Sequence, residues 1–171
     1  FSTGVKQKKF RMDKWESRLN QIRELSDIPC DNPYEEVCPI RDLGTIGTGN
    51  HFAEFQCLEH VYREEEAKRL GLLHGRLMLL IHSGSRGYGQ EILNRYYSPE
   101  GLAEGSKEAE DYLKEHDSAV LWAGRNRIVT AKKLLTWLGV EREVTPLLES
   151  CHNYLERTED GWLHRKGSVS T

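Results

Sequence analysis

Three histidines in this chain stand where an apolar run meets a polar or glycine-rich turn. They are His51, His82 and His152. A neutral imidazole nitrogen is a good ligand for Mn, Fe, Co, Ni and Zn, so three converging histidines would form a transition-metal site. They lie much farther apart in sequence than the ligands of zinc fingers or of a helical His-x-x-x-His pair. Such a site must be assembled by the tertiary fold, and each histidine taken alone is typical of a hydrogen-bonded structural residue.

The turn that follows His82 has the composition of a phosphate-binding turn. Ser83, Gly84 and Ser85 are small enough to let backbone N–H groups approach an anion. Arg86 comes next, and a guanidinium can make a bidentate contact with a phosphate. The alternative is an ordinary glycine-containing turn that carries a surface arginine.

These residues must be positioned by a mixture of helices and strands, which makes the predicted fold class α+β, with mixed sheet elements and flanking helices. Hydrophobic periodicity predicts helices over residues 8–26, 61–70, 88–97 and 107–138. It predicts strands over residues 51–58, 77–81, 144–151 and 161–164. The run 77–81 is wholly apolar and indicates a buried strand, whereas the three prolines within 27–39 indicate a loop.

Composition bounds the class of protein. The 171 residues suit one domain, with 37% hydrophobic and 30% charged residues. A net charge of −3 argues against a protein that coats nucleic acid nonspecifically. No apolar run approaches the ~20 residues of a membrane helix. No secretory signal pattern is visible, and the four cysteines contain no C-x-x-C pair. We therefore expect a cytoplasmic protein with free thiols and no membrane association.

Four segments together resemble the RtcB family of RNA-splicing ligases, which seal RNA ends with GTP and manganese. They occur in the family's order and span roughly residues 40–171. The segments are LGTIGTGNHFAEFQ (43–56), IHSGSRGYG (81–89), CHNYLERTE (151–159) and HRKGS (164–168). A single His-Ser-Gly would be weak evidence for the family, but the four segments in this order, with their glycines, are specific to it.

The resemblance implies a role for individual residues of these segments. Metal ligands would be His51, His82 and His152, the last two on the second manganese of a pair. Residues around the guanine nucleotide would be Asn50, Phe52, Glu54 and Asn153. RNA phosphate would be contacted by Arg86 and Lys166. Without the resemblance, core packing for Phe52 and a solvent-facing position for Glu54 remain equally open.

The remaining histidines lack such a context. His60 and His116 fall in charged helical surroundings, where we expect solvated side chains. His164 precedes a tripeptide that the family shares. A basic group at Arg125, Arg127, Lys132 and Lys133 is either a solvated helix face or an RNA contact.

By resemblance, the complete enzyme would join an RNA 3′-phosphate or 2′,3′-cyclic phosphate end to a 5′-hydroxyl end. GTP would guanylylate a histidine, GMP would pass to the RNA 3′-phosphate, and the 5′-hydroxyl would then attack. Two Mn²⁺ ions and GTP are the implied cofactors, RNA is the implied substrate, and the family also admits an activating protein partner.

Two of the family's chemical segments have no counterpart here. The guanylylated histidine belongs to a His-Gly-Ala-Gly-Arg type segment downstream of Arg165-Lys166-Gly167, and a bridging cysteine to an Asp-x-x-Cys-Gly-Met segment upstream of Gly47. Neither Cys30 nor Cys38 fits the latter. We therefore expect residues 1–171 to be the central portion of a single RtcB-like catalytic domain that is inactive by itself. Gln90 departs from the histidine that many relatives carry there.

Two other functions remain open from the sequence. One is a metal-dependent phosphoesterase that shares these motifs and needs no GTP. The other is a non-catalytic RNA-binding fragment whose affinity would depend on salt.

Overall fold

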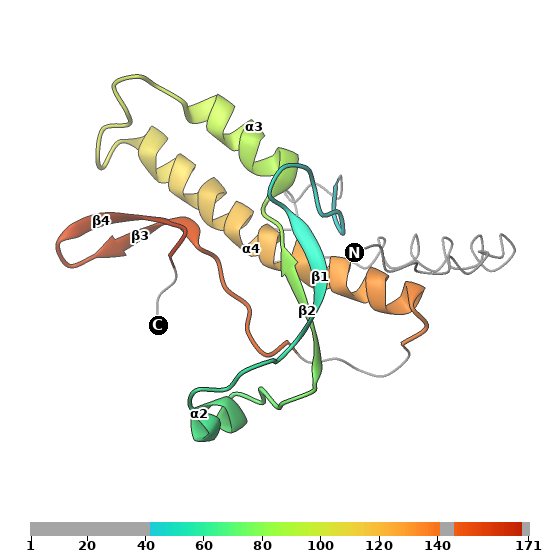
Figure 1. Ribbon diagram of the computed structural model, residues 1–171. Coiled ribbons are helices and arrows are strands. Elements are labelled where there is room, and N and C mark those ends of the chain that lie inside the picture. Colours follow the sequence, from blue (N-terminus) through green and yellow to red (C-terminus); the bar gives the residue numbers. More distant parts are fainter. Residues whose placement is uncertain (1–41, 141–145, 169–171) are drawn as a thin grey trace, which may run out of the picture.

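The computed structural model describes residues 42–140 and 146–168 (Figure 1). In chain order the elements are β1 (Phe52–Cys57), α2 (Glu64–Arg69), β2 (Leu77–His82), α3 (Arg86–Tyr96), α4 (Lys107–Trp137), β3 (Asn153–Thr158) and β4 (Gly161–Lys166). The α+β class is confirmed. The helix predicted over 8–26 and the loop over 27–39 lie outside the described residues.

The described strands form two separate antiparallel pairs. Strand β1 pairs with β2, and Phe52 lies opposite His82. Strand β3 pairs with β4, and Asn153 lies opposite Lys166. Two of the candidate site segments are therefore fixed by hydrogen-bonded register at the ends of hairpins.

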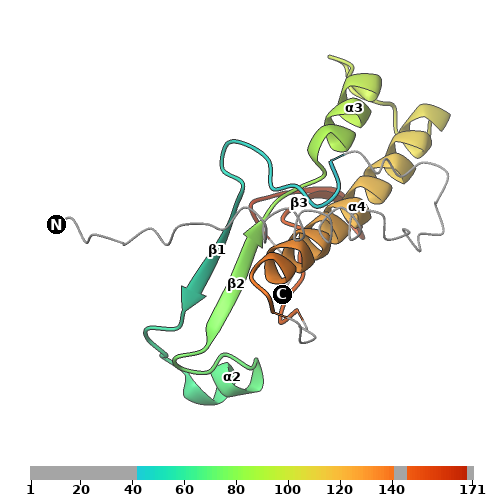
Figure 2. The same ribbon diagram turned by 90° about the vertical axis from the view of Figure 1, so that its right-hand side faces the viewer.

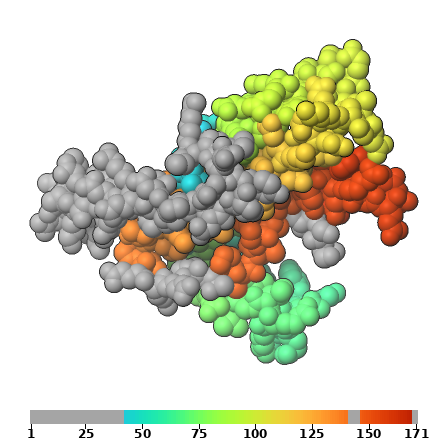
Figure 3. All heavy atoms as spheres, turned by 180° about the vertical axis from the view of Figure 1, so that it is seen from behind, coloured from blue at the N-terminus to red at the C-terminus, as the bar shows by residue number. Residues whose placement is uncertain are grey.

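Helix α4 is the longest of the described elements and lies against both hairpins and α3. It begins after Ser106, whose Oγ accepts a hydrogen bond from the backbone N–H of Ala109 at 3.1 Å, a typical N-terminal cap. In Figure 2 the β1–β2 hairpin crosses beside α4 and carries α2 at its far end. In Figure 3 the β3–β4 hairpin, in red, lies next to the first part of α4, in yellow.

The core lies between α3 and α4. Tyr88 and Ile92 of α3 pack with Ala119 and Trp122 of α4, and Trp122 is only 1% exposed. At the outer end of this interface the Glu115 carboxylate accepts hydrogen bonds from Arg95 and Tyr96. The hydrogen bond to Glu115 raises the pKa of Tyr96, because it stabilises the protonated phenol.

Two expectations about strands were wrong. Strand β2 is not buried: Leu77 is 61% and Leu80 43% exposed, because β2 belongs to a two-stranded sheet with few elements against it. Residues 146–151 form no strand. Pro146 has no N–H to donate, and Leu147 and Leu148 are exposed rather than packed. The next strand, β3, begins only at Asn153.

None of the helices in the described ranges is long and apolar enough to cross a membrane.

The α3–α4 core should depend most on Trp122. Truncation by Trp122→Ala should lower the free energy of unfolding by about 3–5 kcal/mol, because it removes a large side chain from a packed site. The neighbouring Leu121→Ala is the matched control. Leu121 is 54% exposed, so its loss should cost about 0.5 kcal/mol or less. Urea unfolding followed by circular dichroism measures both, and equal effects would contradict this placement of the core.

An ion pair should make the attachment of the β3–β4 hairpin sensitive to acid. Arg157 Nη1 lies 2.6 Å from Glu104 Oε1, and this hydrogen bond lowers the pKa of Glu104. A lowered folded-state pKa adds stability above the unfolded glutamate pKa of about 4.3 and loses it as the pH falls through the folded value. Unfolding curves at several pH values should therefore separate wild type from Glu104→Gln near neutrality and bring them together in acid. Glu100→Gln, with the same change in charge, should show no such convergence.

Candidate functional site

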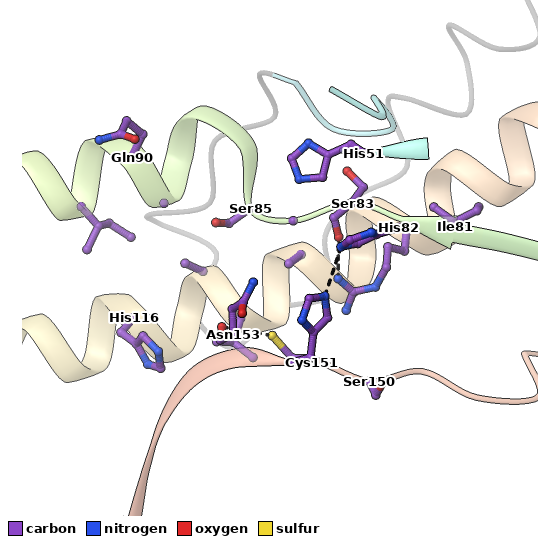
Figure 4. A pocket seen from close by; sticks show the side chains of 18 of the residues that line it. His51, Ile81, His82, Ser83, Ser85, Gln90, His116, Ser150, Cys151 and Asn153 are labelled. Carbon is purple, nitrogen blue, oxygen red and sulfur yellow. Dashed lines mark hydrogen bonds between the residues drawn. The ribbon is translucent and has the colours of Figure 1, made fainter. Parts of the chain in front are cut away.

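The three motif histidines lie around one pocket of about 650 Å³ (Figure 4). His51 directly precedes β1, His82 is the last residue of β2, and His152 directly precedes β3. Three elements distant in sequence therefore contribute one histidine each, as the sequence led us to expect. Their role as metal ligands stays a prediction.

Within this trio, His82 occupies the middle position. Its Nε2 lies 3.1 Å from His152 Nε2, and its ring lies edge-on to the ring of His51 with centroids 5.8 Å apart. Two imidazole nitrogens at that separation either share one proton or present two lone pairs to a cation. The arrangement is thus suited to a proton or to a metal ion between His82 and His152.

The other ring nitrogens of His51 and His152 are not held as those of metal ligands usually are. Nδ1 of His51 and Nδ1 of His152 are buried and have no hydrogen-bond partner among the described residues. A metal-binding imidazole usually has its second nitrogen held by a carboxylate, carbonyl or water, and buried polar atoms are normally satisfied. Among the residues described, no group of three His, Cys, Asp or Glu has metal-binding geometry. The described residues therefore bring two imidazole nitrogens face to face but do not form a complete coordination sphere.

Two of the predicted nucleotide-contacting residues also line the pocket. Phe52 lies edge-on to His82, with ring centroids 5.3 Å apart. Asn153 lines the wall formed by β3, and its Oδ1 accepts a hydrogen bond from the Gly167 N–H at 3.0 Å. The sequence suggested core packing as the alternative for Phe52, but this residue is 37% exposed.

The structure does not place every predicted residue on the pocket wall. Asn50, Glu54, Arg86 and Lys166 are not among the lining residues. Glu54 is exposed on β1 and accepts a hydrogen bond from Gln56 at 2.6 Å. Lys166 is exposed at the base of the β3–β4 hairpin, opposite Asn153.

Arg86 joins the first two histidine motifs. It has a left-handed backbone conformation with φ of 54°, and its Nε donates to Thr45 Oγ1 at 3.3 Å. A Cβ atom at Gly47 would collide with both the Arg86 guanidinium and the His51 ring, so this position requires glycine. The guanidinium therefore lies beside His51.

One expectation about histidines was confirmed and another was wrong. The side chain of His60 is 76% exposed, as expected. The side chain of His116 is only 14% exposed, lines the pocket, and accepts a hydrogen bond from the Leu155 N–H at 3.1 Å. A charged helical neighbourhood gave no signal of this contact, because its partner belongs to β3, far along the chain.

Part of the basic group on α4 has structural partners. Arg127 donates to the Ser83 carbonyl at 2.8 Å and pairs with Glu149, while Lys133 donates to the Leu43 carbonyl at 3.1 Å. These contacts weaken the case that this group is an RNA-binding surface. They also show that α4 holds the segments around the pocket.

Comparison with known proteins gives the class to which this arrangement belongs. The family model described as tRNA-splicing ligase RtcB matches residues 14–171, so the match extends well before the four motifs. RNA-splicing ligase RtcB2 of Escherichia coli is 37% identical over 184 aligned residues, which cover 99% of this chain and 47% of the relative. The tRNA-splicing ligase RtcB of Nanoarchaeum equitans is 36% identical over 162, covering 74% of this chain and 33% of the relative.

A third relative, the tRNA-splicing ligase RtcB of Pyrobaculum aerophilum, is 31% identical over 161 aligned residues, covering 74% of this chain and 33% of the relative. This chain thus belongs to the RtcB family, and it spans about half or less of the length of these curated relatives.

We expect the chain to bind one divalent transition metal weakly through its histidines. Co²⁺ is a convenient probe because imidazole coordination changes its visible absorption. His82→Ala should weaken Co²⁺ binding by about tenfold or more, because the middle nitrogen of the trio is lost.

The matched control is His60→Ala, which removes an exposed histidine that does not line this pocket. Titration of wild type and both variants should show reduced affinity for His82→Ala alone. Equal affinities for the wild type and His82→Ala would remove His82 from the ligand set.

Proposed function

We propose that this chain is the central portion of a single RtcB-like catalytic domain, in a cytoplasmic RNA ligase. The enzyme would join an RNA 3′-phosphate or 2′,3′-cyclic phosphate end to a 5′-hydroxyl end. The observation that carries this proposal is the meeting of His51, His82 and His152 around one pocket, each from a separate family-matching segment.

The histidine trio is the proposed holder of divalent metal. His82 and His152 would share one ion, because their Nε2 atoms already face each other at 3.1 Å. His51 would bind the neighbouring ion of a two-manganese site. Its ring lies beside that of His82, but the His82 Nε2 faces His152. When bound, Mn²⁺ would neutralise phosphate charge and orient the reacting oxygens.

The rim of the pocket is the proposed binding place for the RNA phosphate. Arg86 lies beside His51 through Gly47, and its guanidinium offers several N–H donors in one plane. Lys166 stands at the base of the hairpin that begins one residue after His152. These two cations would hold a phosphate near the proposed metal.

GTP is the proposed second substrate. A volume of about 650 Å³ lies within the usual range for small-molecule sites, and the lining includes Phe52 and Asn153. Phe52 offers a ring against which a base can stack, and Asn153 offers an amide. Asn50 and Glu54 lie just before and within β1, so they would contact the nucleotide from outside the pocket lining.

The covalent steps need a nucleophile from a segment that this sequence does not contain. A histidine would attack the α-phosphorus of GTP and release pyrophosphate, and the GMP would then pass to the RNA 3′-phosphate. The 5′-hydroxyl oxygen would then attack the phosphorus of the RNA 3′-phosphate, forming the phosphodiester bond and releasing GMP. The chain of 171 residues should therefore form no covalent GMP adduct by itself.

Ligation by a full-length protein that contains this chain tests the proposal. With GTP, Mn²⁺ and end-matched RNA, His82→Ala should lower the ligation rate by about 100-fold or more, because a metal ligand next to the reacting phosphate is lost. His60→Ala should ligate at the wild-type rate, and circular dichroism should show both variants folded.

The same experiment separates the two rival functions. Release of phosphate from RNA ends without GTP and without joining would favour a phosphoesterase. Salt-dependent RNA binding without turnover would favour a binding module. Normal ligation by folded His82→Ala protein would overturn the assignment of the trio.

A further inference from the structure

We propose that two consecutive residues of α4, Asn126 and Arg127, are positioning residues that set the relative placement of the three histidine segments. Asn126 would fix the His51 segment against the turn after His82, and Arg127 would fix that turn against the His152 segment. The inference builds on the proposed function, but its structural part can be tested without metal or RNA.

Asn126 is 0% exposed, and its amide is fully engaged by two segments. Its Oδ1 accepts hydrogen bonds from the N–H groups of Gly44 and Thr45, at 2.7 and 3.2 Å. Its Nδ2 donates to the Thr45 carbonyl at 2.9 Å and to Ser83 Oγ at 3.1 Å, with the Gly84 carbonyl at 3.4 Å. One side chain is therefore hydrogen-bonded to both the loop before His51 and the turn after His82.

Ser83 extends this hydrogen-bond network. It is 3% exposed, and its hydroxyl accepts from Asn126 and donates to the Ile46 carbonyl at 2.6 Å. From Ile46 the chain runs through Gly47 to His51, and the His51 Nε2 lies 4.0 Å from where a Gly84 Cβ would stand. The place of the His51 ring next to His82 thus depends on the Asn126–Ser83 network.

Arg127 supplies the second connection. Its Nη1 donates to the Ser83 carbonyl at 2.8 Å, and its Nε lies 3.0 and 3.1 Å from the two carboxylate oxygens of Glu149. Only 13% of the Arg127 side chain is exposed. Because Glu149 lies three residues before His152, this bridge holds the His152 segment against the end of β2.

The chemistry of Asn126 excludes its closest substitute. An aspartate has the same shape but only accepts hydrogen bonds, so a carboxylate would face the carbonyl oxygens of Thr45 and Gly84, and a Ser83 hydroxyl that already donates to Ile46. The two donors of the amide are therefore essential. A lysine in place of Arg127 would keep the positive charge. It would lose the planar guanidinium, whose several N–H groups bond Ser83 and Glu149 at the same time.

Hydrogen–deuterium exchange of the whole chain tests the positioning directly. Asn126→Asp should accelerate amide exchange by on the order of tenfold in peptides that cover 44–51 and 83–85, because buried hydrogen bonds are lost there. Arg127→Lys should act instead on peptides that cover 83–85 and 149–153. Should Asn126→Asp fail to fold, Ser83→Ala gives the milder version, with faster exchange in 44–51.

Glu115→Gln is the matched control on the same helix. It loosens the contact of Glu115 with Arg95 and Tyr96 but touches none of the histidine segments. The control should leave exchange near the pocket unchanged. If it accelerates exchange there as much as the Asn126 and Arg127 variants do, the two residues contribute only general stability and the inference is overturned.

Co²⁺ absorption adds a readout at the site itself. Both variants should weaken Co²⁺ binding by about 10- to 100-fold, as expected for residues that orient metal ligands, while Glu115→Gln should not. Absence of Co²⁺ binding by the wild type would count against the proposed metal site and leave the exchange result to decide the positioning roles. Unchanged exchange in both variants would overturn them whatever the metal does.

Discussion

Helix α4 carries the arrangement of the pocket, because it is the described element against which α3, β2 and β3 all pack. The two hairpins do not share a sheet. A hairpin of two strands is marginal on its own, since it buries too little apolar surface to offset its loss of conformational entropy. Each hairpin must therefore gain its order from contacts with α4. The histidines at the hairpin ends take their mutual distances from that one helix.

The contacts that transmit this order are largely polar. Apolar packing is non-directional and tolerates small shifts of one element against another. Hydrogen bonds to a buried amide tolerate them poorly, because an unpaired buried donor or acceptor costs free energy. At Asn126 and Ser83 every shift of the loop or the turn would break a bond inside a buried environment. A polar network of this kind defines one arrangement of the segments, as a site with converging side chains requires.

The sequence predicted those features of the fold that a local residue pattern determines. Periodicity located β1, β2, α3 and α4 to within a few residues, and the apolar run before His82 identified its strand. Local pattern could not reveal that β2 is half exposed, because exposure depends on which elements cover the strand. Nor could it reveal the partner of His116, which is a backbone N–H on another element.

The same limit applies to the site. The family-like segments pointed to the three histidines, and tertiary structure brings them together. Asn126 escaped notice because a lone asparagine within a long amphipathic helix usually faces solvent. The only local hint in the sequence is the run Leu-Trp-Ala-Gly (121–124) shortly before Asn126, which is typical of a buried stretch of helix. Distance along the chain hides its partners, which lie more than 40 residues away.

Charge decides where an anion can bind on a chain whose net charge is −3. Several arginines of the described region are matched by carboxylates: Arg95 by Glu115, Arg127 by Glu149, Arg157 by Glu104 and Arg165 by Glu156. A guanidinium already paired with a carboxylate has little attraction left for phosphate. Arg86 differs, since its Nε donates to the neutral hydroxyl of Thr45, and its guanidinium lies beside His51. Its charge is therefore not neutralised by any ion pair among the described residues, which leaves it able to attract an anion close to His51.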